Sequence, residues 1–449
     1  MASEEPTVLI IGAGTFGAST AYHLSQTYQD PSRVTLIDRW DPNSPLQDKQ
    51  AAAIDTNRII RTDYESHLYC NVANEAIHFW FWNIAVQGHF HKNGWKVLDY
   101  KESGFGDAVK NTFKERGSNI TSDFSCEELQ NYDVLKGINK EDFSQGYHNP
   151  EAGWCDAEKA TTSFTKTALE MGVKRVVGEV GELLLDQSHS KLKGVRLVDG
   201  KVLEADQIIL AAGAWTSALL SPVEDVLKLQ EKDRIERQIT AVGRLSAYYT
   251  LSEQETQSII DAKMPVVVLG GLADVIPPSQ PNRTLKINDL RTEIVNTVPT
   301  ASGHRITVPS RRHQTDVPRK LIEESTRVIH EAMPAWSKSR TPSRWRICYD
   351  AVTPTEDWLM CRHPNDKLSN LYLAVGGSFH SYKFLPVAGR YMLNVLKGKS
   401  NGEEKDRAWR WKSSQELTQR SGKEFGNSAR NGQRRELKDY EDAERSSKL

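Results

Sequence analysis

The chain has 449 residues, more than a single hydrophobic core usually holds, so at least two packed units are expected. Hydrophobic residues make up 38% and charged residues 26% of the chain, which excludes a disordered or fibrous protein. Basic residues number 58 and acidic residues 59, so the chain has no overall field to attract nucleic acid or an anionic membrane. The five cysteines are widely spaced without a CxxC pair, which favours reduced thiols over a disulfide framework or a metal site.

The two ends of the chain carry different signals. The N-terminus enters a strand pattern without a basic segment, and no run of about 18 apolar residues follows, so neither a signal peptide nor a membrane anchor is expected. Beyond residue 398 the composition turns to charge, Ser, Asn and Gly, and we expect a surface tail with exposed Trp409 and Trp411. Its last residues, Ser447, Lys448 and Leu449, are the tripeptide that the peroxisomal import receptor reads, which predicts a peroxisomal protein.

The first forty residues predict a β-α-β unit that binds a dinucleotide. Residues 7–11 are wholly apolar, a helical pattern follows, and a second apolar run at residues 34–37 ends in an acid. The glycine motif between strand and helix, with that acid, is Gly12, Gly14, Gly17 and Asp38. Its glycines permit a tight turn, close approach of a pyrophosphate and close helix packing, while the acid accepts from a ribose hydroxyl. The alternative is a glycine-rich turn in an unrelated α/β fold.

Later segments predict a domain that is discontinuous in sequence. Residues 204–215 read as another buried strand ending in small residues, and residues 371–377 as a strand followed by glycines and a helix. Between them lie many short β-like runs and a helical pattern at residues 317–333. The predicted class is α/β (α+β), with a Rossmann-like FAD-binding domain and a mixed β-sheet substrate domain. The FAD-binding segments are 1–100, 150–220 and 341–400, the substrate segments are 101–149 and 221–340, and the tail is 401–449.

Five motifs occur in an order typical of one protein family. With these motifs, which span most of residues 6–400, the chain resembles the sarcosine oxidase and fungal amadoriase (fructosyl amino acid oxidase) family of covalent FAD-dependent amine oxidases. The motifs are Gly12, Gly14, Gly17 and Asp38; Asn57, Arg58, Ile59, Ile60, Arg61 and Tyr64; Leu285, Lys286 and Ile287; Arg346, Ile347 and Cys348 followed by Arg362, His363 and Pro364; and GGSFHSYKF at residues 376–384.

The resemblance implies that FAD is attached covalently through a thioether to Cys348. A thiol adds to an electron-poor flavin when it is close and has thiolate character, to which Arg344 and Arg346 would contribute. A buried structural cysteine is the alternative. The other cofactor-binding residues that the resemblance implies are Gly12, Gly14, Gly17, Asp38, Arg39, Val180, Gly213, Gly376, Gly377 and Lys383.

The resemblance also assigns catalytic roles to five cationic or titratable residues. Lys286 matches a lysine beside the flavin N5 that promotes reaction with oxygen, because a fixed cation stabilises developing superoxide. Arg61 and Lys383 match residues that hold the substrate carboxylate. Arg58 would contact the flavin or the oxygen site, and His380 would border the flavin. A solvated strand edge for Lys286 and ordinary surface cations for Arg61 and Lys383 are the alternatives.

The substrate signatures of the family are absent at the positions where they are expected. Counted without gaps from Lys286, the substrate-end Tyr and His of sarcosine oxidase fall near Val275 and on Leu290, and the amadoriase acid also falls on Leu290. The proline-rich residues 275–281 would reshape the entrance. Sarcosine, pipecolate, saccharopine, fructosyl amino acids and an N-methylated biosynthetic intermediate whose imine cyclises therefore all remain as substrates.

The predicted function is oxidation of the C–N bond of a secondary amine, an N-substituted amino acid, with oxygen as acceptor and imine and hydrogen peroxide as products. The expected partners are this small amine, oxygen and the peroxisomal import receptor, with no nucleic acid, membrane or metal. Two functions of other classes remain. A non-catalytic flavin-binding protein would explain the lost Tyr and His, and an NAD-dependent dehydrogenase would share the glycine motif.

Overall fold

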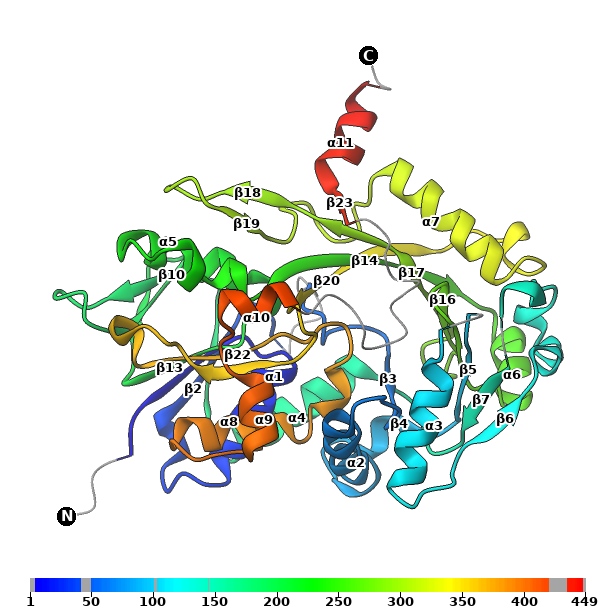
Figure 1. Ribbon diagram of the computed structural model, residues 1–449, viewed down its shortest axis with the longest axis horizontal. Coiled ribbons are helices and arrows are strands. Elements are labelled where there is room, and N and C mark those ends of the chain that lie inside the picture. The colour runs from blue at the N-terminus through cyan, green and yellow to red at the C-terminus, as the bar shows by residue number, and fades with distance from the viewer. Residues whose placement is uncertain (1–4, 42–49, 101–102, 144, 420–433, 447–449) are drawn as a thin grey trace.

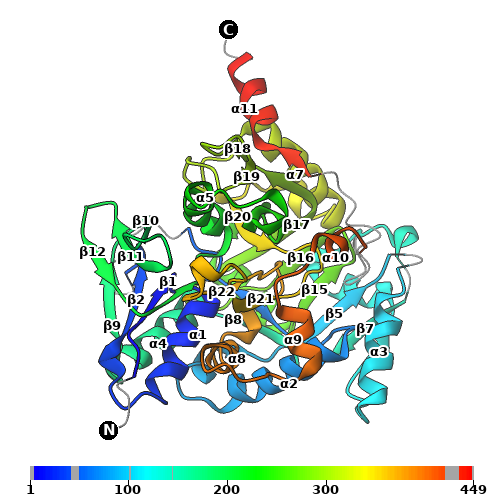
Figure 2. The same ribbon diagram turned by 60° about the vertical axis from the view of Figure 1, so that its left-hand side comes forward.

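Two β-sheets of different kinds organise the molecule (Figure 1). The computed structural model describes residues 5–41, 50–100, 103–143, 145–419 and 434–446. The predicted peroxisomal tripeptide at 447–449 lies outside these residues. A six-stranded sheet carries the glycine motif, and a nine-stranded sheet curves beside it (Figures 1 and 2).

The six-stranded sheet confirms the predicted β-α-β unit. Its order is β21-β22-β13-β1-β2-β9, parallel except for β21. The strands are β1 (Val8–Ile11), β2 (Val34–Asp38), β9 (Lys174–Val177), β13 (Gln207–Leu210), β21 (Leu359–Arg362) and β22 (Leu371–Val375). The wholly apolar β1 is buried on both faces, as parallel strands are. Val8 and Ile10 pack in one core and Leu9 and Ile11 in another.

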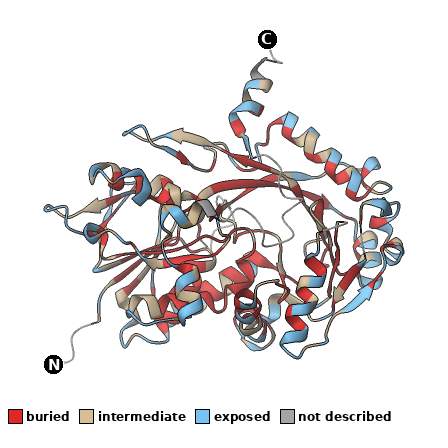
Figure 3. Cartoon of the chain, viewed as in Figure 1, coloured by how far each residue is buried: buried red, intermediate tan, exposed pale blue. Residues whose placement is uncertain are grey.

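Helices and a small sheet cover the two faces of this sheet. Helix α1 (Thr15–Ser25) follows the glycine motif and packs against α4 (Ala157–Glu170) and α8 (Ala388–Leu396). Figure 3 shows buried residues, in red, along these helices. The other face is covered by helix α5 (Thr216–Val226) and by a three-stranded sheet. That sheet consists of β10 (Val180–Leu185), β11 (Leu192–Leu197) and β12 (Val202–Glu204).

The nine-stranded sheet is mixed, with the order β20-β14-β17-β16-β15-β5-β7-β6, and β23 pairs with β17. Most pairs are antiparallel, whereas β15 with β5 and β23 with β17 are parallel. One face packs on helix α7 (Arg319–Ala332), and the other faces a cavity. The strands are β5 (Trp95–Leu98), β6 (Ser122–Phe124), β7 (Gly146–Asn149), β14 (Thr240–Thr250), β15 (Val266–Leu269), β16 (Ala273–Ile276), β17 (Thr284–Val295), β20 (Arg344–Val352) and β23 (Arg435–Glu436).

The remaining helices and strands lie outside these sheets, and β3 brings Arg58 to the cavity. The helices are α2 (His67–Trp82), α3 (Phe105–Glu115), α6 (Glu253–Asp261), α9 (Glu403–Trp409), α10 (Ser414–Gln419) and α11 (Leu437–Ser446). The strands are β3 (Arg58–Ile60), β4 (Phe90–His91) and β8 (Gly153–Cys155), which form one sheet, and β18 (Thr297–Pro299) with β19 (Arg305–Thr307), which form another. Within the described ranges, no helix is long and apolar enough to cross a membrane, and no cluster of His, Cys, Asp and Glu suits a metal ion.

Two features differ from the sequence-based expectations. Strands β5 and β20 lie inside segments assigned to the FAD-binding domain, yet both belong to the nine-stranded sheet; the domain boundaries themselves stay a prediction. The expected exposure of the tail tryptophans was wrong. Trp409 is 1% exposed because its ring stacks on Trp358 at 4.6 Å, and Trp411 is half-buried against His363.

Candidate active site

The main cavity is lined by one face of the nine-stranded sheet and by the loops that face it. Because strand side chains alternate, every second residue points into the cavity. Strand β14 contributes Arg244 and Ser246, β16 contributes Asp274 and Ile276, β17 contributes Asn288 and Leu290, and β20 contributes Cys348 and Asp350. The predicted Arg58, Arg61, Gly377, His380 and Lys383 line the same cavity from the opposite side.

A second cavity adjoins the first at the glycine motif. Thr15, Ala52, Ala53 and Asp350 line both cavities, so one extended space runs from the motif to Cys348. The predicted cofactor residues that line the second cavity are Gly12, Gly14, Asp38, Arg39, Val180 and Gly213. The guanidinium of Arg39 stacks over the Trp215 ring at 4.8 Å and so covers one end of this space.

The glycine motif has the geometry that a bound dinucleotide requires. Gly12 has φ +103°, and a Cβ there would lie 2.4 Å from the Ala211 carbonyl oxygen. A Cβ on Gly17 would lie 1.7 Å from the Gly12 carbonyl oxygen, so only glycine permits this contact between helix and strand. Asp38 accepts from the Ala13 amide at 2.6 Å and stands at the end of β2. Both the close approach and the acid that the sequence predicted are therefore present.

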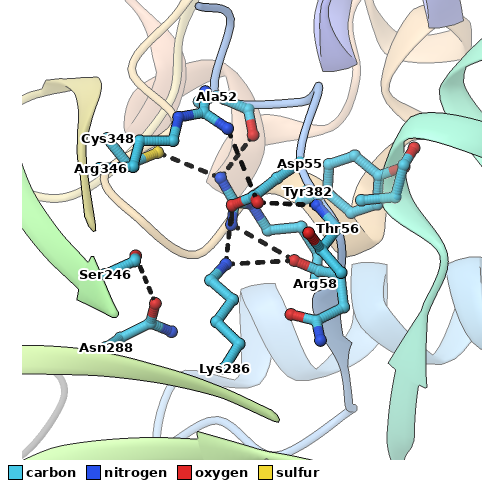
Figure 4. Close-up of polar contacts among 12 residues, drawn as sticks. Ala52, Asp55, Thr56, Arg58, Ser246, Lys286, Asn288, Arg346, Cys348 and Tyr382 are labelled. Carbon is cyan, nitrogen blue, oxygen red and sulfur yellow. Dashed lines mark hydrogen bonds and ion pairs between the residues drawn. The ribbon is translucent and has the colours of Figure 1, made fainter. Parts of the chain in front are cut away.

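A buried carboxylate, Asp55, gathers the cations of the site (Figure 4). Lys286 Nζ donates to Asp55 at 2.7 Å, and Arg58 and the Tyr248 hydroxyl also donate to it. Arg346 is 3.6 Å away. Although burial opposes ionisation, these cations hold the pKa of Asp55 well below its usual range. Three cations share one carboxylate, so the cluster carries net positive charge.

Lys286 is fully buried, as its apolar strand suggested. It lies on the same side of β17 as the lining residues Asn288 and Leu290, but its ammonium bonds to Asp55 and it does not line the cavity itself. Its burial and the neighbouring Arg58 lower its pKa to about 8, while Asp55 acts in the opposite direction. The ion pair with Asp55 excludes a solvated strand edge. Sequence reasoning did not identify Asp55; the only signal was that a buried lysine needs a counterion.

Cys348 lies in β20, 6% exposed, with its side chain in the cavity. Arg58 Nη2 donates to its sulfur at 3.1 Å. Arg346 also interacts electrostatically with Cys348. The expectation for Arg344 was wrong, because its guanidinium lies over the Tyr248 ring at 4.0 Å and the residue is exposed.

Arg61 and Lys383 come together at another part of the cavity. The Arg61 guanidinium lies between the rings of Tyr64 and Trp95, at 4.6 and 4.7 Å. Lys383 Nζ donates to the Tyr64 hydroxyl at 2.8 Å. Burial and the charge of Arg61 hold the pKa of Lys383 well below its usual value. Asp63 acts on Lys383 in the opposite direction, and two cations beside this one carboxyl form a site that a further anion would stabilise.

His380 belongs to the wall beside this pair of cations. Its ring bonds to the Glu356 carbonyl oxygen at 2.9 Å and to the Tyr64 hydroxyl at 3.1 Å. Its own carbonyl oxygen accepts from Lys383 Nζ. His380 therefore fixes the loop that carries Lys383, and its place beside a flavin stays a prediction.

Comparison with known proteins identifies the family. The profile described as "FAD dependent oxidoreductase" matches residues 7–394. The chain belongs to this family. L-saccharopine oxidase of Schizosaccharomyces pombe is 25% identical over 427 residues, which covers 90% of this chain and 93% of that protein. The amino acid oxidase fsqB of Aspergillus fumigatus is 26% identical, with 86% and 91% covered, and human peroxisomal sarcosine oxidase is 22% identical, with 86% and 91% covered.

Solved structures show the same fold. Fructosamine oxidase (amadoriase II) of Aspergillus fumigatus in complex with FSA matches with a TM-score of 0.80 at 22% identity, covering 98% of this chain and 97% of that chain. A modified fructosyl peptide oxidase of Aspergillus nidulans has a TM-score of 0.78 at 25% identity, with 97% and 99% covered. The resemblance to sarcosine oxidases and amadoriases and the mixed α/β class are thus confirmed, and the chain is an FAD-dependent oxidoreductase.

The residues of the two cavities fit FAD. The glycine motif and Asp38 would hold its adenosine and pyrophosphate, and the space beside Cys348 and Gly377 would hold its ring. Gly376 does not belong to the cavity lining; with φ +86° it turns the chain, and a Cβ there would lie 2.8 Å from Thr353. FAD supplies the electron-accepting ring. The residues of this chain would position that ring and set the electrostatic field around it.

One expectation about the substrate end was wrong. Val275 points into the core on the other face of the sheet, and its neighbour Asp274 lines the cavity instead. Of residues 275–281, Ile276 lines the cavity, whereas Pro277, Pro278 and Ser279 are buried without lining it. That this loop reshapes the entrance stays a prediction. Leu290 does line the cavity, as counted from Lys286.

Proposed function

We propose that the protein oxidises the C–N bond of a secondary amine, an N-substituted α-amino acid, and passes the electrons to oxygen. The pair Arg61 and Lys383 supports this proposal, because the two cations adjoin a cavity that Cys348 also lines. A carboxylate bound by two cations would fix the amino acid so that its C–H bond faces the ring of the cofactor. The reaction converts R₂CH–NHR′ and O₂ into R₂C=NR′ and H₂O₂.

The test is anaerobic reduction of the holoenzyme flavin by N-methyl, cyclic and fructosyl amino acids, each beside its carboxamide. The proposal expects bleaching of the flavin by acids in strong preference to amides. A flavin that stays oxidised with every amine would favour the non-catalytic flavin-binding protein. The family assignment and the Arg58 contact with Cys348 leave no support for an NAD-dependent dehydrogenase.

Within this class the substrate is set by the N-substituent. The names of the relatives point to saccharopine, sarcosine and other amino acids, and those of the structural neighbours to fructosyl amines. The missing amadoriase acid at Leu290 disfavours a fructosyl amino acid, although Asp274 supplies a carboxylate from the adjacent strand. An N-methylated intermediate whose imine cyclises also fits.

A covalent thioether between Cys348 and FAD is part of the proposal. It is supported by the guanidinium at 3.1 Å from the sulfur and by the place of the sulfur in the cavity. Acid-precipitated wild-type protein should stay yellow, and its intact mass should include FAD. Cys348→Ser should release all flavin on denaturation, whereas the matched Cys155→Ser should keep it bound. Flavin that remains attached in Cys348→Ser would assign the bond to another residue.

We also propose import into peroxisomes. The tripeptide at residues 447–449 and the oxidase reaction support this, since a peroxide producer suits that organelle. Helix α11, which ends at residue 446, projects away from the body of the molecule in Figures 1 and 2. A fluorescent fusion that keeps the C-terminus should enter peroxisomes, and deletion of Leu449 should leave it in the cytosol.

A further inference from the structure

Arg244 brings a positive charge to a part of the cavity wall that the reaction described above does not use. It lies in β14, directly between Cys348 of β20 and Glu293 of β17 in the strand register. Its side chain is 10% exposed and lines the cavity. Nε and Nη2 both donate to one oxygen of Glu293. These two nitrogens form one edge of the guanidinium, so the end that carries Nη1 is not used by this pair.

The chain adopts a costly backbone conformation beneath this arginine. Phe379 has φ +61°, in the left-handed region that bulky residues rarely adopt, and its ring lies 4.0 Å below the Arg244 guanidinium. Asp350 holds the turn by accepting from the Phe379 amide at 2.7 Å. The ring also packs against an apolar cluster of Val242, Val295 and Val352. The strained turn therefore serves as a platform that fixes the guanidinium at the cavity.

A distant segment of the chain completes the arrangement. Arg434 Nε donates to the second oxygen of Glu293 at 3.2 Å. It is placed there because the next residues, β23, pair with Ile294 and Val295 of β17. Burial opposes ionisation of Glu293, but Arg244 and Arg434 lower its pKa below the usual value. Two guanidiniums thus share one carboxylate, while Asp350 on the same wall also interacts electrostatically with Arg244.

We propose that Arg244 binds an anionic group on the N-substituent of the amine, and that Arg434 positions Arg244 by sharing the charge of Glu293. The inference rests on the proposed function, in which Arg61 and Lys383 bind the carboxylate of the amino acid itself. An isolated Arg244–Glu293 pair would attract an anion weakly, because the carboxylate would offset the whole charge of Arg244. Arg434 also bonds to Glu293, so this carboxylate is shared between two cations. Ser246 and Asn288, which follow Arg244 along the wall and are hydrogen-bonded at 2.7 Å, add polar groups beside it. The substrate class is an amino acid whose N-substituent carries a second carboxylate.

The experiment compares two probes of nearly equal shape, N-(2-carboxyethyl)alanine and N-(2-carbamoylethyl)alanine, with the full-length holoenzyme. A charge-assisted contact predicts that the acid is preferred about 10- to 100-fold in kcat/KM. Arg244→Met should lower this preference to near one. Arg434→Gln should lower it about 3- to 10-fold through KM rather than kcat, and Arg434→Lys should restore most of it.

Arg435, the residue that follows Arg434, offers a matched control. It donates to Glu324 of α7, on the far side of the strand from Glu293, so Arg435→Gln should retain the wild-type preference. Equal rates with both probes in the wild type would overturn the inference, as would equal effects of Arg434→Gln and Arg435→Gln, which would indicate a purely structural role. Loss of covalent flavin in Arg244→Met would assign the arginine to the cofactor and also overturn it.

The two proposals fail in different ways. If N-alkyl amino acids reduce the flavin but the acid probe has no advantage, only the inference about Arg244 is wrong. If no amine of the panel reduces the flavin, the proposed function is wrong and this inference falls with it.

Discussion

Lys286→Met should slow reoxidation of the reduced flavin by oxygen about 10²- to 10³-fold, the size of effect expected when one fixed charge that stabilises a developing anion is removed. Anaerobic reduction by substrate should change much less. Methionine keeps the length of the side chain without its charge. Asp55 retains Arg58, Arg346 and Tyr248 as partners, so no uncompensated carboxylate is left in the core. Stopped-flow mixing of the reduced enzyme with oxygen measures the first rate, and anaerobic mixing with substrate measures the second.

Lys96 provides the control for this variant. It is also a buried lysine of the nine-stranded sheet, but it points to the opposite face, where its ammonium pairs with Glu128. Lys96→Met should leave oxygen reactivity unchanged. If Lys286→Met slows both half-reactions equally, the residue supports the fold or binds substrate, and the role in oxygen activation is wrong.

The same lysine predicts a pH dependence. Because burial and Arg58 lower its pKa to about 8, Lys286 is protonated below this pH and loses its charge as the pH rises through it. Reoxidation should therefore be fast below about pH 8 and should fall above it. Lys286→Arg, which stays charged, should remove this fall, and Lys286→Met should be slow at every pH. A rate that rises with pH in the wild type would contradict the assignment.

The local parts of the fold were predictable because local sequence determines them. The apolar β1, the glycine motif and Asp38 lie within 31 consecutive residues, and each has a geometric requirement that few residue types meet. Local sequence does not determine the sheet to which a strand belongs. Strand β20 joins the nine-stranded sheet through pairing with β14, about a hundred residues earlier, and no local pattern encodes that partner.

The candidate site shows the same division. Arg61, Lys383 and Cys348 were found because the motifs that contain them resemble those of a known family, and all three line one cavity. Asp55 was missed because the sequence says that a buried Lys286 needs a counterion but not which of 59 acidic residues provides it. The expectation that Val275 lines the pocket was wrong because side chains alternate along a strand. A shift of one residue on β16 moves a side chain to the other face of the sheet.

Arg61→Ala should lower kcat/KM for an N-substituted amino acid by roughly 30- to 1000-fold, because a desolvated, charge-assisted contact with the carboxylate is lost. The loss should be much smaller for the matching carboxamide, so the preference for the acid disappears. The variant should fold because the neighbouring carboxyl of Asp63 can become neutral. Burial raises the pKa of Asp63 to about 6, although the charge of Arg61 acts to lower it. Without Arg61 that pKa rises further, and the carboxyl becomes neutral instead of remaining as a buried charge.

Chemical rescue distinguishes a direct contact from a change of shape. Added guanidinium ion should restore oxidation of the acid by Arg61→Ala, since the space between the Tyr64 and Trp95 rings suits a planar cation. Added guanidinium ion should not change the rate at which the carboxamide is oxidised. Arg390→Ala, which removes an exposed arginine paired with Glu75 on the surface, should retain the full preference for the acid. If amines without a carboxylate reduce the wild-type flavin as fast as the acids do, Arg61 and Lys383 do not bind a substrate carboxylate. The substrate would then be a different amine, although the flavin and the oxygen chemistry at Lys286 would stand.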